Sequence, residues 1–119
     1  MAATDTPTAP VAKPCGASDT NRACLADTHD LAAAFAKAMH GDYQSQRNIA
    51  WAFSGASPFV EADPVQACAW RQVISATRPA DATYADDDQK RVDCGKLTAG
   101  QIEAADRVSA QIIAGMKTR

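Results

Sequence analysis

The spacing of apolar residues between positions 43 and 78 predicts two short helices joined by a turn that contains proline. In the first helix, four apolar residues fall on one stripe at about 100° per residue: Ile49, Ala52, Phe53 and Ala56. That stripe predicts the buried face of a helix that runs from Tyr43 to Ala56. Because neither helix can bury its apolar surface alone, we expect the rest of the chain to pack around this pair.

The second helix of the pair begins after Asp63, which suits an N-cap. Pro64 follows in the first turn, where its missing N–H would have had no partner in the helix. Its apolar residues form two adjacent stripes: Val65, Ala69, Val73 and Ala76 on one, and Ala67, Trp70 and Ile74 on the other. Three polar residues remain outside this arc: Arg71, Ser75 and Arg78. So wide an apolar arc predicts neighbours on two sides of the helix.

Further helices are predicted on both sides of the pair. The apolar residues from Ser18 to His40 keep to one arc, which predicts a single helix of about six turns. Gly41 then suits a left-handed C-cap, and Asp42 opens the next helix. Beyond the pair, a short helix is expected from about Asp86 to Cys94, with acidic residues at its positive end.

The last predicted helix opens with a capping box, in which Thr98 and Gln101 bind each other's backbone N–H groups. Its apolar stripe consists of Ile102, Ala105, Val108, Ile112, Ile113 and Met116. At the other end of the chain, residues 1–17 are rich in Ala, Thr and Pro with almost no large apolar side chains. We therefore expect residues 1–17 to be a disordered leader and residues 18–119 to form a single helical domain.

Composition narrows the class of protein. The 119 residues carry a formal charge of −2 with acidic and basic residues mixed, so no basic surface for nucleic acid is predicted. No apolar run reaches the length of a membrane span. Four cysteines in so short a chain favour disulfides and an oxidising compartment. The expected location is the periplasm or the medium, and the chain would be a mature form whose export signal has been replaced by a methionine.

The cysteines are expected to be structural, since they show neither the spacing nor the histidine partners of a zinc site. Four thiols allow three pairings, and sequence alone does not decide among them. We favour Cys68 with Cys94, because Cys68 lies at the outer edge of its helix and can reach a segment laid over it. The remaining pair is then Cys15 with Cys24, which ties the leader to the first helix.

No catalytic, metal or cofactor site is predicted. His29 and His40 would lie about 16 Å apart along one helix and cannot share a metal ion. The run from Asp86 to Asp88 lacks the alternate spacing of a calcium loop, so we interpret it as a solvated helix start. No cysteine has a general base beside it, which leaves catalysis by a thiol without support.

Trp51 is the candidate for a binding role. It lies about 200° around its helix from Ile49, on a polar face. The residues proposed for this binding surface are Tyr43, Gln44, Arg47, Asn48 and Trp51. An aromatic ring among Arg, Asn and Gln is typical of a protein-binding hot spot. The alternative, that the leader or the first helix packs over Trp51, remains open.

Asp63 is followed by Ala67 and Trp70, and the helix around Ile49 to Phe53 precedes it. This stretch resembles the second half of a Sel-one-like repeat, a relative of the tetratricopeptide repeat. The resemblance covers about one repeat, and the segment from Leu97 is similar to the one that follows the last repeat in bacterial members. It implies an all-α fold, a short α/α solenoid of antiparallel helices, here stapled by disulfides. In such repeats the first helix of a pair faces a concave groove, which again points to the Tyr43 helix.

The resemblance also implies a role in protein binding. Together with the cysteines, which favour export, it leads us to expect an exported protein-binding module without catalytic activity, monomeric or weakly dimeric. A periplasmic immunity or inhibitor protein that masks a toxin, or an adaptor of an envelope complex, would fit this description. The alternative is a protein that binds cell-wall fragments, or an enzyme, of the cysteine-rich repeat type. A third possibility is a purely structural part of an envelope assembly.

Overall fold

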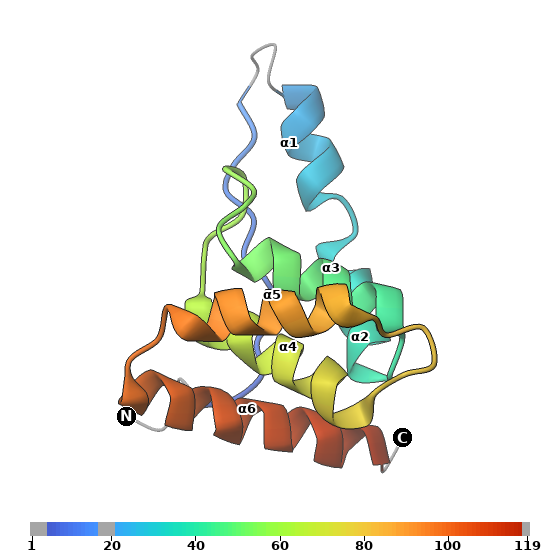
Figure 1. Cartoon of the computed structure of the whole chain (residues 1–119). Coiled ribbons are helices and arrows are strands. Elements are labelled where there is room, and N and C mark those ends of the chain that lie inside the picture. Colours follow the sequence, from blue (N-terminus) through green and yellow to red (C-terminus); the bar gives the residue numbers. More distant parts are fainter. Residues whose placement is uncertain (1–4, 17–20, 118–119) are drawn as a thin grey trace.

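The computed structural model describes residues 5–16 and 21–117, and this part of the chain is helical, with no named strand. Its helices are α1 (Asn21–Thr28), α2 (Leu31–Met39), α3 (Tyr43–Phe53), α4 (Pro64–Thr77), α5 (Tyr84–Gly95) and α6 (Ala99–Lys117). Figure 1 shows α2 to α6 gathered in a helical body, from which α1 projects. None of the described helices combines the length and the apolar character needed to cross a bilayer.

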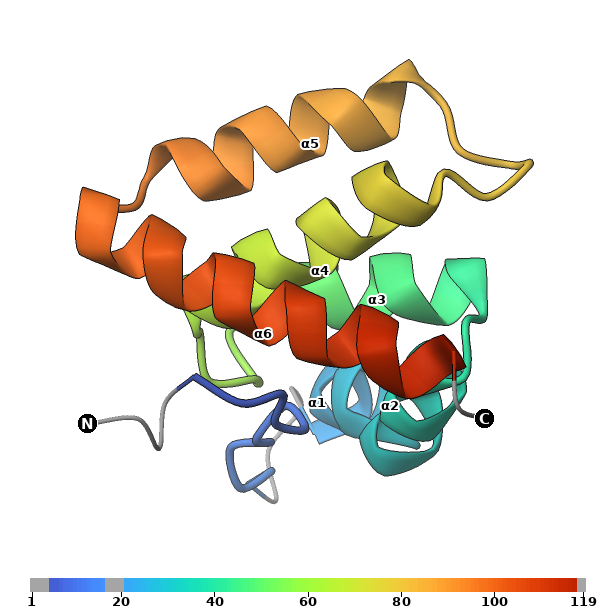
Figure 2. The same cartoon turned by 90° about the horizontal axis from the view of Figure 1, so that it is seen from below.

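Helix α4 is the centre of the body, because it packs against α3, α5 and α6, while α2 packs on α3. Seen from below, α4 lies between α5 and α6 (Figure 2). Trp70 of α4 is fully buried and meets Phe35 edge to face, with ring centroids 6.2 Å apart. The predicted apolar arc of α4 therefore has neighbours on more than two sides, and the fold is all-α. The finer expectation of a Sel-one-like solenoid stays a prediction.

Local capping explains where most helices begin, and most of these caps were predicted. Asp42 accepts a hydrogen bond from the Ser45 N–H at 2.9 Å, and Asp63 caps α4 ahead of Pro64. The capping box before α6 is also confirmed: Thr98 N–H donates to Gln101 Oε1 at 2.9 Å, and Gln101 N–H donates to Thr98 Oγ1 at 3.2 Å. Such pairs satisfy N–H groups that the helix itself leaves unpaired.

The prediction of one helix from Ser18 to His40 is wrong within the described residues. The chain breaks between α1 and α2 at Asp30, which has a left-handed backbone with φ 58°. The two halves are held by different partners, since α2 packs on α3 whereas Asp27 of α1 accepts a hydrogen bond from Ser57 Oγ at 2.7 Å. Asp tolerates the left-handed conformation better than most residues, which allows the break. The predicted start at Ser18 lies outside the described residues.

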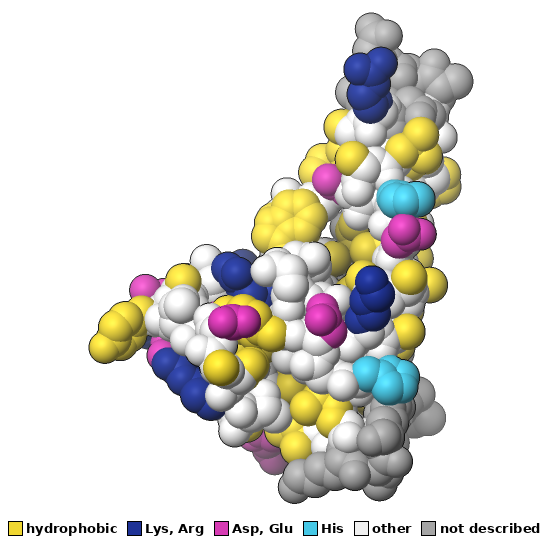
Figure 3. Space-filling view, turned by 90° about the vertical axis from the view of Figure 1, so that its right-hand side faces the viewer, with side chains coloured by type: hydrophobic (Ala, Val, Ile, Leu, Met, Phe, Trp, Pro, Cys, Tyr) yellow, Lys and Arg dark blue, Asp and Glu magenta, His cyan; other side chains and the backbone are white. Residues whose placement is uncertain are grey.

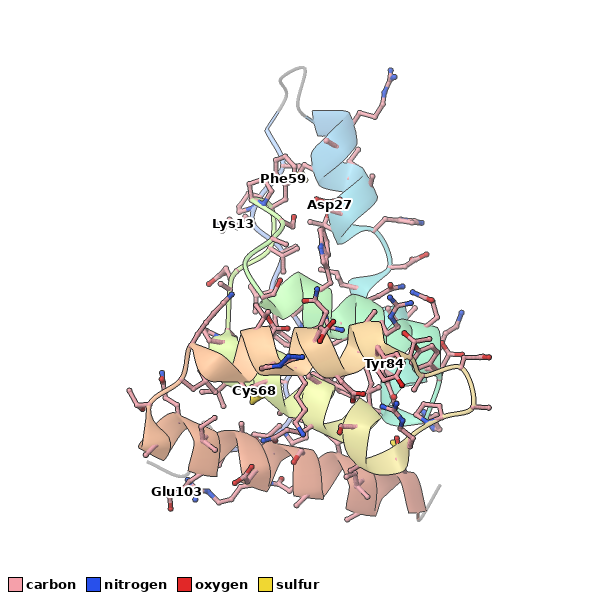
Figure 4. The ribbon with its side chains drawn as sticks, in the orientation of Figure 1. Lys13, Asp27, Phe59, Cys68, Tyr84 and Glu103 are labelled. Carbon is pink, nitrogen blue, oxygen red and sulfur yellow. A yellow bond between two sulfur atoms is a disulfide. The ribbon has the colours of Figure 1, made fainter. Side chains whose placement is uncertain are left out.

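The projecting part of the molecule, here called the arm, consists of α1, residues 9–16 and residues 54–62 (Figure 1). Two backbone hydrogen bonds join its extended segments: Lys13 N–H to Phe59 O at 2.8 Å and Glu61 N–H to Val11 O at 2.9 Å. Figure 4 shows Lys13 and Phe59 side by side in the arm. Residues 5–16 thus differ from the expected disordered leader, because they have backbone partners and a disulfide in place of a hydrophobic core.

Several side chains lie elsewhere than the sequence predicted. Ala56 follows the end of α3 at Phe53 and is exposed, and Ala76 is exposed near the end of α4. In contrast, Arg71 was expected outside and is buried, and Asp86 was expected in solvent and is also buried. Both charged side chains are buried beside an oppositely charged partner, which a wheel drawn for one helix does not reveal.

Candidate binding groove

The exposed face of α3 contains most of the residues proposed for binding. Asp42 fixes the start of the helix, and the helical repeat then places Gln44, Arg47, Asn48 and Trp51 along one side. Gln44 Nε2 donates to Asn48 Oδ1 at 2.9 Å, which orients both amides. Trp51 is 43% exposed, so neither the arm nor the N-terminal segment covers it within the described residues.

A groove runs between α3 and α5 over the surface of α4. It consists of two adjoining hollows of about 240 and 420 Å³ that share Trp51, Arg71 and Gln89. Gln44, Arg47 and Asn48 line one hollow, and Val92, Asp93 and Lys96 line the other. We call this feature the α3–α5 groove. Of the predicted surface, Tyr43 is the one residue that does not line it.

A further hollow of about 240 Å³ lies on the arm side of α3 and is lined by Asp27, Leu31 and Trp51, among others. Figure 3 shows the recess between the arm and the body, where hydrophobic side chains gather, with acidic and basic side chains spread over the body. Trp51 therefore borders open space on both sides of α3. This position makes Trp51 the one large aromatic side chain that lines all three hollows.

Arg71 forms the floor of the α3–α5 groove and is only 5% exposed. Its Nε donates to Asp93 Oδ2 of α5 at 3.0 Å, and both side chains of this ion pair are buried. Lys96 Nζ lies 4.0 Å from the other Asp93 oxygen. The pair links α4 to α5 and keeps a guanidinium group at the bottom of a surface groove.

Asp86 is the second buried carboxylate of α5, and it links this helix to α3. It accepts hydrogen bonds from Tyr43 Oη at 2.5 Å and from the Thr83 N–H at 3.0 Å, and Arg47 Nε lies 3.4 Å from its other oxygen. Asp86 and Thr83 also form the capping box of α5. Tyr43 thus acts as a positioning residue between two helices, and its ring lies 5.6 Å from the Arg47 guanidinium carbon.

These contacts set the ionisation of the pair in opposite directions. Burial works to raise the pKa of Asp86, but the hydrogen bonds from Tyr43 and Thr83 and the charge of Arg47 outweigh it and lower that pKa. Burial and the hydrogen bond to Asp86 raise the pKa of Tyr43. At neutral pH the cluster therefore contains a carboxylate and a neutral phenol.

Arg71, Asp86 and Asp93 belong to this region although the polar face of α3 gave no sign of them. A signal was present, since Asp86 and Asp93 are seven residues apart and so share one face of α5. Two carboxylates on the inner face of a helix need cationic partners there, which Arg47 of α3 and Arg71 of α4 provide. The missing information was the position of α5 relative to α3 and α4.

Both favoured disulfide pairings are present. Cys68 of α4 is bonded to Cys94 of α5 with Cα atoms 4.7 Å apart, and Cys15 is bonded to Cys24 in the arm with Cα atoms 5.7 Å apart. Figure 4 labels Cys68 on α4, beneath α5. Two disulfides in a chain of this size are consistent with an oxidising environment.

Within the described residues, no cluster of three or more His, Cys, Asp or Glu side chains is arranged to hold a metal ion. His29 and His40 are exposed. The other two residues of the acidic run form ion pairs at the surface, Asp87 with Arg78 and Asp88 with Arg91.

Comparison with known proteins adds no relative: no protein-family model, no curated protein sequence and no solved structure matches this chain.

Proposed function

We propose that this chain is an exported protein that binds another protein through the α3–α5 groove, with Trp51 as the central contact. The observation that carries the proposal is the 43% exposure of Trp51 between hollows that are bordered by arginine and amide side chains. Trp and Arg are the residues most enriched at the energetic centres of protein interfaces. Export is supported by the two disulfides, and no catalytic activity is proposed.

An open groove suits a protein partner better than a small ligand. Small molecules usually bind in hollows that enclose most of their surface, whereas the α3–α5 groove is bordered by the half-exposed Arg47 and by the exposed Val92. The resemblance to Sel-one-like repeats supports the same role for the face of α3. A toxin that is masked by this protein, or a component of the cell envelope, is the class of partner that we propose.

The test compares recovery of partners from a periplasmic extract by three oxidised forms: wild type, Trp51→Ala and Tyr84→Ala. Tyr84 is the matched control, because it is an aromatic residue at the start of α5 that is 86% exposed and lines neither hollow of the groove (Figure 4). We expect Trp51→Ala to lose a protein that the other two forms retain, with affinity weakened at least about 30-fold. Equal recovery by all three forms would refute the proposal.

A second candidate function is binding of a cell-wall fragment, and one hollow favours it. A space of about 620 Å³ lies where the N-terminal segment meets the starts of α4 and α6. Its lining combines apolar side chains such as Val65 with polar ones, including Thr8, Asp63, Gln66 and Gln101. A few polar groups in such a hollow can orient a small ligand. A thermal shift with muropeptides that disappears in Gln101→Ala would favour this function. The absence of any shift would leave the protein-binding function as the stronger proposal.

A further inference from the structure

The two arginines of the α3–α5 groove each lie beside a carboxylate of α5. Each uses Nε to contact a buried carboxylate of α5, Arg47 with Asp86 at 3.4 Å and Arg71 with Asp93 at 3.0 Å. A guanidinium group carries its other N–H donors on the two Nη atoms, in a planar fork that matches a carboxylate. In the described part of the chain, neither arginine makes a hydrogen bond through its Nη atoms. Arg71 is thus fixed by a buried hydrogen bond, Arg47 lies half-exposed beside Asp86, and both have donors to spare.

Burial makes the donors of Arg71 significant. Arg71 is only 5% exposed and has lost most of its hydration. A hydrogen bond from one of its unused N–H groups to a ligand is therefore stronger than the same bond at a fully hydrated side chain. Arg71 lines both hollows of the groove, which means that a ligand in either can reach it. Because its Nε is already bound to Asp93, little side-chain entropy remains to be lost on binding.

The charge of the groove has the sign that an acidic ligand needs. Its charged lining residues are three cations, Arg47, Arg71 and Lys96, and one carboxylate, Asp93, in a chain whose formal charge is −2. Asp93 is already paired with Arg71 and faces Lys96. Trp51 and Val92 add apolar surface on opposite sides, from α3 and α5. The lining therefore complements a carboxylate that has an apolar neighbour.

We infer that the α3–α5 groove recognises an acidic segment of its protein partner, in which an Asp or Glu side chain reaches Arg71 and Arg47 while an adjacent aromatic or aliphatic residue packs on Trp51. This inference rests on the proposed function and names the chemistry of the partner. The carboxylate forms a charge-assisted hydrogen bond with the Nη groups at the groove floor. Lys96 supplies attraction at the rim, so binding weakens as the salt concentration rises.

The test is selection from a phage-displayed library of random dodecapeptides on the immobilised, oxidised protein. We expect the selected peptides to be enriched in Asp or Glu next to a large apolar residue. A peptide chosen from this set is then measured by calorimetry, together with its Asp→Asn or Glu→Gln counterpart. The acidic form should bind at least about tenfold more tightly than the amide form, and more tightly at low salt. A selection without binders, or without acidic enrichment, would overturn the inference.

Variants separate this inference from the proposed function. Arg47→Gln should weaken binding of the acidic peptide about tenfold, because it removes one cation of the groove. The fold should be preserved, since Asp86 keeps its hydrogen bonds from Tyr43 and Thr83. Arg91→Gln is the matched control, since Arg91 is an exposed arginine of α5 that lines neither hollow of the groove. Equal effects of the two variants would overturn the acidic chemistry. If neutral peptides depend on Trp51 but not on Arg47, the groove still binds protein and only the inferred chemistry fails.

Discussion

The ion pair between Arg71 and Asp93 gives the sharpest test of how this structure is held together. Its atoms are 3.0 Å apart and both side chains are buried, so removal of either partner leaves an uncompensated charge in a poorly hydrated site. Breaking a buried pair in this way costs about 3–5 kcal/mol. We expect Arg71→Met to lie at the lower end of this range, because Lys96 Nζ is 4.0 Å from Asp93 and supplies partial compensation.

The expected change in melting temperature follows from the size of the chain. An unfolding entropy of about 2.1 cal/mol/K per residue gives roughly 250 cal/mol/K for 119 residues, so that 1 kcal/mol shifts the melting temperature by about 4 °C. Arg71→Met and Asp93→Leu should each lower it by roughly 12–20 °C. The double variant replaces both charges with apolar groups, and we expect its stability to lie within about 1 kcal/mol of wild type.

The assay is urea unfolding of the oxidised proteins, followed by circular dichroism at the helical band. The double variant makes it a double-mutant cycle, whose coupling term isolates the pair. The exposed pair Arg91 and Asp88 serves as control, and its cycle should give less than about 0.5 kcal/mol. The reasoning is refuted if each single variant loses less than 1 kcal/mol, or if the double variant loses the sum of the two single losses.

Three further predictions concern stability. The double variant Cys68→Ala, Cys94→Ala opens a loop of 26 residues and should lower the free energy of unfolding by about 3.5 kcal/mol in denaturant titrations. A loss below about 1 kcal/mol would show that the disulfide constrains the unfolded chain little. Folding lowers the pKa of Asp86, so the contribution of this carboxylate to stability is present at neutral pH and is lost as the pH falls below about 4. Acid titrations should therefore show a shallower loss of stability for Asp86→Asn than for wild type, and equal slopes would contradict this. Gly41→Ala places a side chain at φ 101° and should lower the stability measured by thermal unfolding by about 1 kcal/mol. Gly100→Ala has open space around it and should be neutral or stabilising. Similar values for both variants would count against backbone strain at Gly41.

Local signals in the sequence predicted most of the helical body. The caps at Asp42, Asp63 and Thr98 depend on residues within one turn of the helix start, so they can be recognised without any tertiary information. The apolar stripe of α6 is likewise confirmed, because Ala105 and Val108 face the core. The disulfide pairing followed from the position of Cys68 at the edge of its helix.

Features that depend on distant segments escaped prediction. Residues 5–16 carry little apolar surface, so their composition suggested that they would not pack. Composition does not reveal the backbone hydrogen bonds that join this segment to residues 59–61. The floor of the groove was missed for a related reason: Arg71 looks like a surface residue until α5 brings Asp93 to it. Four of the five residues proposed from the polar face of α3 do line the groove, because that face follows from the helical repeat.

The two tryptophans of this chain lie in opposite surroundings, Trp70 without solvent contact in the centre of the body and Trp51 at the surface. Their emission should differ accordingly, with a blue-shifted band from the inner indole and a red-shifted band from the outer one. A quencher such as iodide would reach the outer indole alone. Intrinsic fluorescence can therefore follow occupancy of the groove and loss of the core as two separate signals from one unlabelled sample.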